Sequence, residues 1–212
     1  MGGTEGGVVS EAVTGAWRRI ESWLEVRAPA SHRSLRPPAS EGALGAAEAE
    51  WGGPLPEGPK ALLRLHDGAQ RYAVAGDAEG ACAPDAFLGG YTLLPLSRMT
   101  GLYRLHTDDR LAGGTWWGER WLPWCAKDGD RVGLFLDGAS GRMGRWGRTN
   151  GPTAGVYPSL VHYLTLFAEA LETGRGDLVR SRWVPGLACG CLLWGDPDRP
   201  PAGGAGWVPV HR

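Results

Sequence analysis

The side chains with the greatest potential for chemistry are four cysteines and two histidines. They are Cys82, Cys125, Cys189, Cys191, His66 and His106. Thiolates and imidazoles are ligands that zinc prefers, so Cys189-Gly190-Cys191 and the others could complete a tetrahedral site. Alternatively, Cys125 is a small core residue in a strand and the Cys189–Cys191 pair occupies a tight turn. We favour the second interpretation and expect no metal and no cofactor. The cysteines are also too few and too irregularly spaced for a disulfide framework, so we expect reduced thiols.

Motifs that impose a known reaction are missing from the sequence. It lacks Gly-x-x-x-x-Gly-Lys, a Gly-x-Gly-x-x-Gly between a strand and a helix, His-Glu-x-x-His and Gly-x-Ser-x-Gly. His66 and Asp67 could act as an acid–base pair, but a histidine in the last turn of a helix also interacts favourably with the helix dipole. We prefer this capping role and predict that the chain is not an enzyme.

The densest aromatic cluster consists of Trp116, Trp117, Trp121 and Trp124. Tryptophan supplies large contact areas at protein interfaces, so this cluster is a candidate binding surface. In the alternative, some of these side chains pack beneath a sheet. Trp121 and Trp124 are predicted to face opposite sides of one strand, which would place one in the core and the other at the surface.

Composition indicates a folded protein of ordinary globular type. Of 212 residues, 42% are hydrophobic and 21% are charged, and the formal net charge is −1. Such a balance gives no general attraction for nucleic acid or for an anionic membrane. No stretch approaches the ~20 apolar residues of a membrane span, and we find no secretory leader. We therefore expect a cytoplasmic protein that binds neither nucleic acid nor membrane.

Apolar periodicity predicts three helices in the first third of the chain. Val13, Trp17, Ile20 and Leu24 form one stripe, which predicts a helix over about 10–27. Ser40 is a candidate N-cap for a second helix over 41–51, which Gly52-Gly53-Pro54 would end. A third helix carries Leu62, Leu63 and Leu65. The region 69–90 is predicted as a loop with an edge strand near 72–74.

Short apolar segments bounded by glycine predict strands at 91–96, 120–126, 131–137 and 142–147. The last three are joined by hairpin-length spacers and should form an antiparallel meander. A final helix begins near Tyr157-Pro158 and ends before Gly174. The order predicts an α+β fold, with N-terminal helices, a mainly antiparallel sheet of four to six strands and a C-terminal helix packed on the sheet.

Two strings of residues follow each other across the second and third predicted helices. The first is Glu48-Ala49-Glu50-Trp51-Gly52-Gly53-Pro54-Leu55-Pro56-Glu57, and the second is Leu62-Leu63-Arg64-Leu65-His66-Asp67-Gly68. Together they resemble the SUKH superfamily, which contains bacterial toxin-immunity proteins and Smi/Knr-type cell-wall-assembly regulators. Residues 90–96, Trp121-Leu122-Pro123-Trp124 and Ser159-Leu160 also match in order. Pro59 departs from the pattern, because the family usually has an apolar residue there.

The resemblance covers residues 10–173 and implies a binding domain without shared catalytic residues. Residues 1–9 are predicted to be a flexible N-terminus. Residues 174–212 are predicted to be an irregular C-terminal extension, either packed on the domain or partly mobile.

The resemblance also implies a protein partner, with a nuclease or deaminase toxin as the leading candidate. The candidate contact residues are Trp116, Trp117, Glu119, Asp108 and Asp109, because tight interfaces combine aromatic anchors with a charged rim. The alternatives are a regulatory or scaffold protein of the Smi/Knr type and a metal-dependent enzyme that uses His66, His106 and the cysteines. The sequence does not indicate the oligomeric state.

Overall fold

The N-terminal part of the fold is one long helix. The computed structural model describes residues 3–72, 74, 82–108, 117–147, 149, 151–201 and 206–211. Helix α1 spans Gly3–Arg27, and the predicted stripe of Val13, Trp17, Ile20 and Leu24 is fully buried. The helix begins earlier than the predicted position near Ser10, so that boundary was wrong. Whether the first nine residues are flexible stays a prediction.

Three shorter helices follow: α2 (Pro29–Ser34), α3 (Glu41–Trp51) and α4 (Glu57–Leu65). The Ser40 hydroxyl accepts a hydrogen bond from Ala43 N at 3.1 Å, and Gly52 ends α3 in the left-handed conformation with φ of 78°. These caps and the bounds of α3 confirm the prediction. Helix α2 was not predicted, because its six residues lie in a segment with several prolines and polar neighbours.

The segment after α4 contains a fifth helix that was not predicted. Strand β1 has only two residues, Thr92–Leu93, and α5 (Leu96–Thr107) begins directly after Pro95. The Asp67 carboxylate accepts from Leu96 N at 2.7 Å and so satisfies a donor in the first turn of α5. Gly68 has φ of 78°, and a Cβ there would lie 2.3 Å from Pro95 N. The predicted edge strand is wrong for the described residues Tyr72 and Val74, which have no strand conformation.

The main sheet is an antiparallel meander. It contains β1, β2 (Trp121–Lys127), β3 (Val132–Asp137), β4 (Met143–Trp146) and β5 (Thr153–Tyr157) in that order. This confirms the predicted α+β fold class and the predicted meander. Strand β5 was not among the predicted strands.

On one face of this sheet, aromatic rings lie over glycines of neighbouring strands. Gly133 pairs with Trp146, and Phe135 pairs with Gly144. A Cβ at Gly133 would lie 2.1 Å from the Trp146 ring, and a Cβ at Gly144 would lie 2.1 Å from the Phe135 ring. The two glycines therefore provide the space in which these rings pack.

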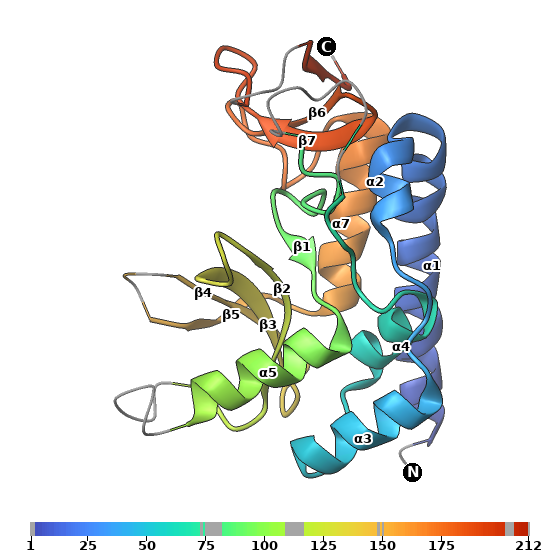
Figure 1. The fold of residues 1–212 in the computed structure, drawn as a ribbon, viewed down its shortest axis with the longest axis vertical. Helices are drawn as coiled ribbons and strands as arrows, with labels where there is room; N and C mark the ends of the chain where they lie inside the picture. Colours follow the sequence, from blue (N-terminus) through green and yellow to red (C-terminus); the bar gives the residue numbers. More distant parts are fainter. Residues whose placement is uncertain are drawn as a thin grey trace.

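Helix α7 (Leu160–Thr173) packs on the sheet, as predicted. Its Tyr163 ring lies 5.6 Å from Trp124 of β2 and 5.0 Å from Tyr157 of β5. The Ser159 hydroxyl accepts from His162 N at the start of the helix. Figure 1 shows α7 beside α1, with the main sheet and α5 extending to one side of this helix pair.

The C-terminal region forms a second sheet, so the prediction of an irregular extension was wrong. Its strands are β6 (Val184–Ala188), β7 (Cys191–Gly195) and β8 (Val208–Pro209), in the order β7-β6-β8. Cys189 and Gly190 both have positive φ, of 52° and 72°, and form the two-residue turn between β6 and β7. The prediction of a tight turn at Cys189-Gly190-Cys191 is confirmed.

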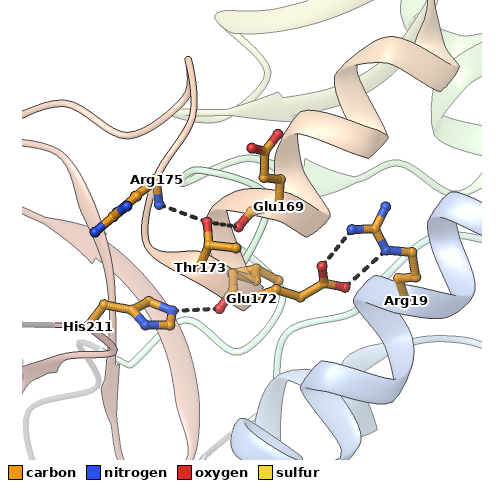
Figure 2. A network of polar contacts seen from close by, with 7 residues as sticks. Arg19, Glu169, Glu172, Thr173, Arg175 and His211 are labelled. Carbon is orange, nitrogen blue, oxygen red and sulfur yellow. Dashed lines mark hydrogen bonds and ion pairs between the residues drawn. The ribbon is translucent and has the colours of Figure 1, made fainter.

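Polar contacts fix this region to the end of α7. Figure 2 shows His211 pointing at the C-terminal turn of α7, where its Nε2 donates to the Leu171 carbonyl at 2.8 Å. Gly174 ends the helix with φ of 69°, and a Cβ there would lie 2.5 Å from the His211 side chain. Arg19 of α1 forms a two-bond ion pair with Glu172, which joins α1 to α7. Residues of α1, α7 and the C-terminal segment therefore meet at one place.

Candidate functional site

The predicted contact residues that the structure describes gather at the C-terminal end of α5. Asp108 follows the helix, and its N–H donates to the Arg104 carbonyl at 2.9 Å. Glu119 is exposed in the turn before β2, and its carbonyl accepts from the Tyr103 hydroxyl at 2.7 Å. The structure thus brings Asp108 and Glu119 to the same end of the molecule. Trp116 and Asp109 lie outside the described residues.

Trp117 lies at this end of α5 but is not an exposed anchor. Its side chain is only 5% exposed, and its Nε1 donates to the Trp121 carbonyl at 2.8 Å. The ring stacks on His106 with a centroid distance of 4.4 Å. The expectation that Trp117 offers surface area is therefore corrected, whereas its importance for partner binding stays a prediction.

Trp117 belongs to a layer of aromatic rings between α5 and the main sheet. The Phe135 centroid lies 5.0 Å from that of Trp117 and 4.4 Å from that of Trp121, and Trp146 lies 5.5 Å from Trp117. Trp121 is half-buried and Trp124 is 1% exposed on the side of α7. The predicted division of the tryptophans between two faces is therefore correct. The layer holds α5 against the sheet, because face and edge contacts between rings are favourable.

A hollow of about 570 Å³ opens beside this layer. We call it the α5 hollow and define it by Leu102, Leu105, His106, Asp130, Arg131 and Trp146. Leu105 is 48% exposed at its edge, whereas Leu102 and Trp146 are buried in its floor. Arg98 forms an ion pair with Asp130, and the Trp146 Nε1 donates to the Asp130 carbonyl at 3.2 Å. The hollow thus combines an apolar floor, an exposed leucine and charged side chains at the rim.

Sequence reasoning missed Leu105, because it did not predict α5. Leu96, Met99 and Leu102 recur at a helical spacing of three, and this stripe is the signal that could have revealed the helix. The polar residues of the opposite face, such as Arg104, would then have made Leu105 conspicuous as an apolar side chain near the solvent face.

The family of the chain follows from its match to a family sequence model. The model of the SMI1 / KNR4 family (SUKH-1) matches residues 38–166, which is more than half of the chain. The chain belongs to this family. This confirms the resemblance found in the sequence. A search of curated proteins found no match.

The SMI1/KNR4 match extends from α3 into α7 and therefore contains the α5 hollow, whereas the C-terminal sheet lies outside it. The Glu48 carboxylate has a structural role in the family-like string at the α3–α4 junction. It accepts from Lys60 Nζ at 2.6 Å and from Leu55 N at 3.1 Å. The hydrogen bond from Lys60 lowers the pKa of Glu48. The departure at Pro59 is accommodated, because this residue lies in the first turn of α4, where a missing N–H breaks no helical hydrogen bond.

The residues of the alternative metal hypothesis do not converge in the SMI1/KNR4 structure. Cys125 is buried in β2, in the main core, whereas Cys82 and Cys191 belong to a separate small core beneath the C-terminal sheet. His66 instead contacts Glu21 and the Arg36 carbonyl, each at 2.9 Å. Within the described part of the chain, no three His, Cys, Asp or Glu side chains form a group that could hold a metal ion.

Among the described residues, no helix has the length and apolarity needed to cross a membrane.

Burial at the α5 hollow lowers the pKa of His106 to about 4, although the charge of Asp130 opposes the shift. The unfolded chain would titrate His106 near its ordinary pKa of about 6.5. Between these two values the unfolded state binds more protons than the folded state. The contribution of His106 to stability is therefore complete above pH ~6.5 and is lost as the pH falls towards ~4.

We expect His106→Phe to reduce the loss of stability on acidification by about 1–2 kcal/mol between pH 7 and pH 4.5. The full pKa difference would correspond to about 3 kcal/mol, but His106 is partly exposed and water screens its charge. Phenylalanine preserves a ring against Trp117 and cannot titrate. Urea denaturation of both proteins at the two pH values measures the difference. An equal loss of stability in the variant and the parent would show that His106 is not held neutral by burial.

Proposed function

We propose that this SMI1/KNR4 protein is an immunity protein that binds a cognate toxin and neutralises it, without catalysis of its own. Membership of the family supports a protein-binding or regulatory module in general. The finer proposal of a toxin, with a nuclease or a deaminase as its class, rests on the resemblance of bacterial members to immunity proteins. It also places the chain in the cytoplasm, where such a toxin would meet its substrate.

The observation that carries the proposal is the α5 hollow with Leu105 at its edge. Interfaces place apolar side chains in a central concave region and polar groups around it. Here Leu102 and Trp146 form the floor, and the rim carries Arg131 and the Arg98–Asp130 pair. The packed aromatic layer beneath the hollow restricts its side chains, so binding a partner would cost little conformational entropy there.

The charges around the hollow support binding rather than acid–base catalysis. A general acid or base works best when its pKa lies near the working pH. His106 is held neutral by a pKa of about 4, and Asp130 is paired with Arg98. Both groups are suited to shape and orient a contact surface.

The proposal is tested with any nuclease or deaminase toxin that a gene next to that of this chain encodes, purified as the full-length protein. A stoichiometric amount of the chain should abolish the nuclease or deaminase activity, and the two proteins should elute together in gel filtration. Full activity in the presence of an excess of the folded chain would refute the immunity role. Co-purification of housekeeping proteins from the native host, with no toxin among them, would favour the regulatory alternative.

A further inference from the structure

A second concave site lies where the main sheet meets the C-terminal sheet. It has a volume of about 190 Å³. We call it the tyrosine pocket and define it by Tyr91, Lys127, Tyr157, Tyr163, Arg180 and Trp183. The first four residues lie within the family match, whereas Arg180 and Trp183 follow it. The pocket is therefore created by the addition of the C-terminal segment to the SMI1/KNR4 domain.

The deepest of these side chains, Tyr163, has a hydroxyl group that lacks a partner among the described residues. The side chain is 4% exposed, and its ring is fixed by edge contacts with Trp124 and Tyr157. Because Tyr163 lines the pocket, an acceptor atom placed there could accept a hydrogen bond from this hydroxyl. Burial also raises the pKa of Tyr163 well above its usual range and that of Tyr91 to about 12. Both phenols are therefore hydrogen-bond donors at neutral pH.

Two cations adjoin these donors. Lys127 Nζ lies 4.5 Å from the centroid of the Tyr91 ring, and Arg180 of the C-terminal segment also lines the pocket. Neither side chain forms an ion pair with any carboxylate in the described part of the chain. Asp177 also lines the pocket, so two positive charges stand against one negative charge among the described lining residues. A ligand with negative charge would satisfy both the phenols and the cations.

The size and the walls of the pocket limit the ligand further. A volume of about 190 Å³ holds roughly six water molecules at ~30 Å³ each and is smaller than the ~300–1,000 Å³ of drug-sized sites. Phe167, Trp183 and Trp194 supply aromatic surface beside the polar groups. The space therefore suits a small molecule that has one charged end and one apolar end.

We propose that the tyrosine pocket binds a small organic oxyanion, a carboxylate or a phosphate ester. Its charged group accepts a hydrogen bond from the Tyr163 hydroxyl and lies near Lys127 and Arg180, while its apolar part contacts Trp183. The site is separate from the α5 hollow and does not depend on the proposed toxin partner.

Isothermal titration calorimetry of the full chain with phenyl phosphate, benzoate and uncharged benzyl alcohol tests the proposal. We expect saturable binding of at least one anion with a dissociation constant between roughly 10 μM and 1 mM, and no saturable binding of the alcohol. The anion that binds more tightly distinguishes phosphate from carboxylate recognition. Tyr163→Phe removes only the hydroxyl and should weaken binding at least ~10-fold without lowering the melting temperature.

Arg180→Gln provides a second variant at an exposed position and should also weaken binding by about 10-fold. Arg182→Gln is the matched control, because Arg182 is exposed, lies two residues further on and does not line the pocket. Arg182→Gln should bind the anions with the same affinity as the parent. The absence of saturable binding of both anions up to roughly 10 mM would overturn the proposal, as would parental affinity in both Tyr163→Phe and Arg180→Gln.

Discussion

Replacement of Gly133 by alanine is expected to lower the free energy of unfolding by about 3 kcal/mol, because it forces overpacking in the aromatic layer. The new Cβ would lie 2.1 Å from the Trp146 ring and 2.5 Å from the Cys125 carbonyl oxygen. Neither neighbour can move away easily. Trp146 is 2% exposed and contacts Trp117, and the Cys125 carbonyl belongs to the adjacent strand β2. The melting temperature should fall by roughly 6–12 °C in a protein of this size.

Gly15→Ala is the matched control for this substitution. Gly15 lies within α1, and a Cβ there would have no atom within 4 Å. Alanine should therefore stabilise the helix by about 0.5–1 kcal/mol. Urea denaturation monitored by circular dichroism compares the two variants. If Gly133→Ala were as stable as the parent, the rings could not pack over β3 as described. The described position of Trp146 in the floor of the α5 hollow would then be wrong.

Much of the helical layer could be predicted from local sequence. The burial of Val13, Trp17, Ile20 and Leu24 follows from their helical spacing, and the bounds of α3 follow from Ser40 and Gly52. Such signals lie within a few residues of the structure that they determine. The meander was predictable for the same reason, because short hairpin spacers separate its apolar strands.

The start of helix α5 could not be predicted in the same way, because the acceptor that fixes it is remote in sequence. Pro95 precedes the helix, and its side chain has no acceptor that could cap the first turn. The acceptor for Leu96 N is instead Asp67, 29 positions earlier in the chain. The apolar segment at 91–96 therefore resembled a longer strand, although only Thr92 and Leu93 pair with β2.

The C-terminal sheet was also beyond local inference. Strand β6 contains Pro185 and Gly186, residues that normally argue against a strand. Gly186 is required there, because a Cβ would lie 2.2 Å from the Trp207 ring, and Trp207 follows 21 positions later. The sheet thus depends on a contact that the sequence pattern does not reveal. The tyrosine pocket, which needs both sheets, could not be foreseen either.

Leu105→Glu is expected to weaken binding of the proposed toxin partner by about 30-fold or more. Leu105 is 48% exposed at the edge of the α5 hollow, and loss of an apolar side chain that acts as a binding hot spot costs at least ~2 kcal/mol in an interface. A glutamate adds the cost of desolvating a charge against the apolar floor formed by Leu102 and Trp146. The fold should be preserved, because the side chain already lies at the surface.

Val208→Glu is the matched control, because Val208 is 52% exposed and lies on β8, in the C-terminal sheet. Both variants should have parental melting temperatures, which establishes that any difference arises at the surface.

The most direct test of the binding surface is the dissociation constant of the partner complex, measured by titration calorimetry for the parent, Leu105→Glu and Val208→Glu. A loss of affinity confined to Leu105→Glu is the predicted result. Equal affinity for the parent and Leu105→Glu, or a loss only in Val208→Glu, would contradict the assignment of the α5 hollow as the site at which this SMI1/KNR4 protein binds its partner.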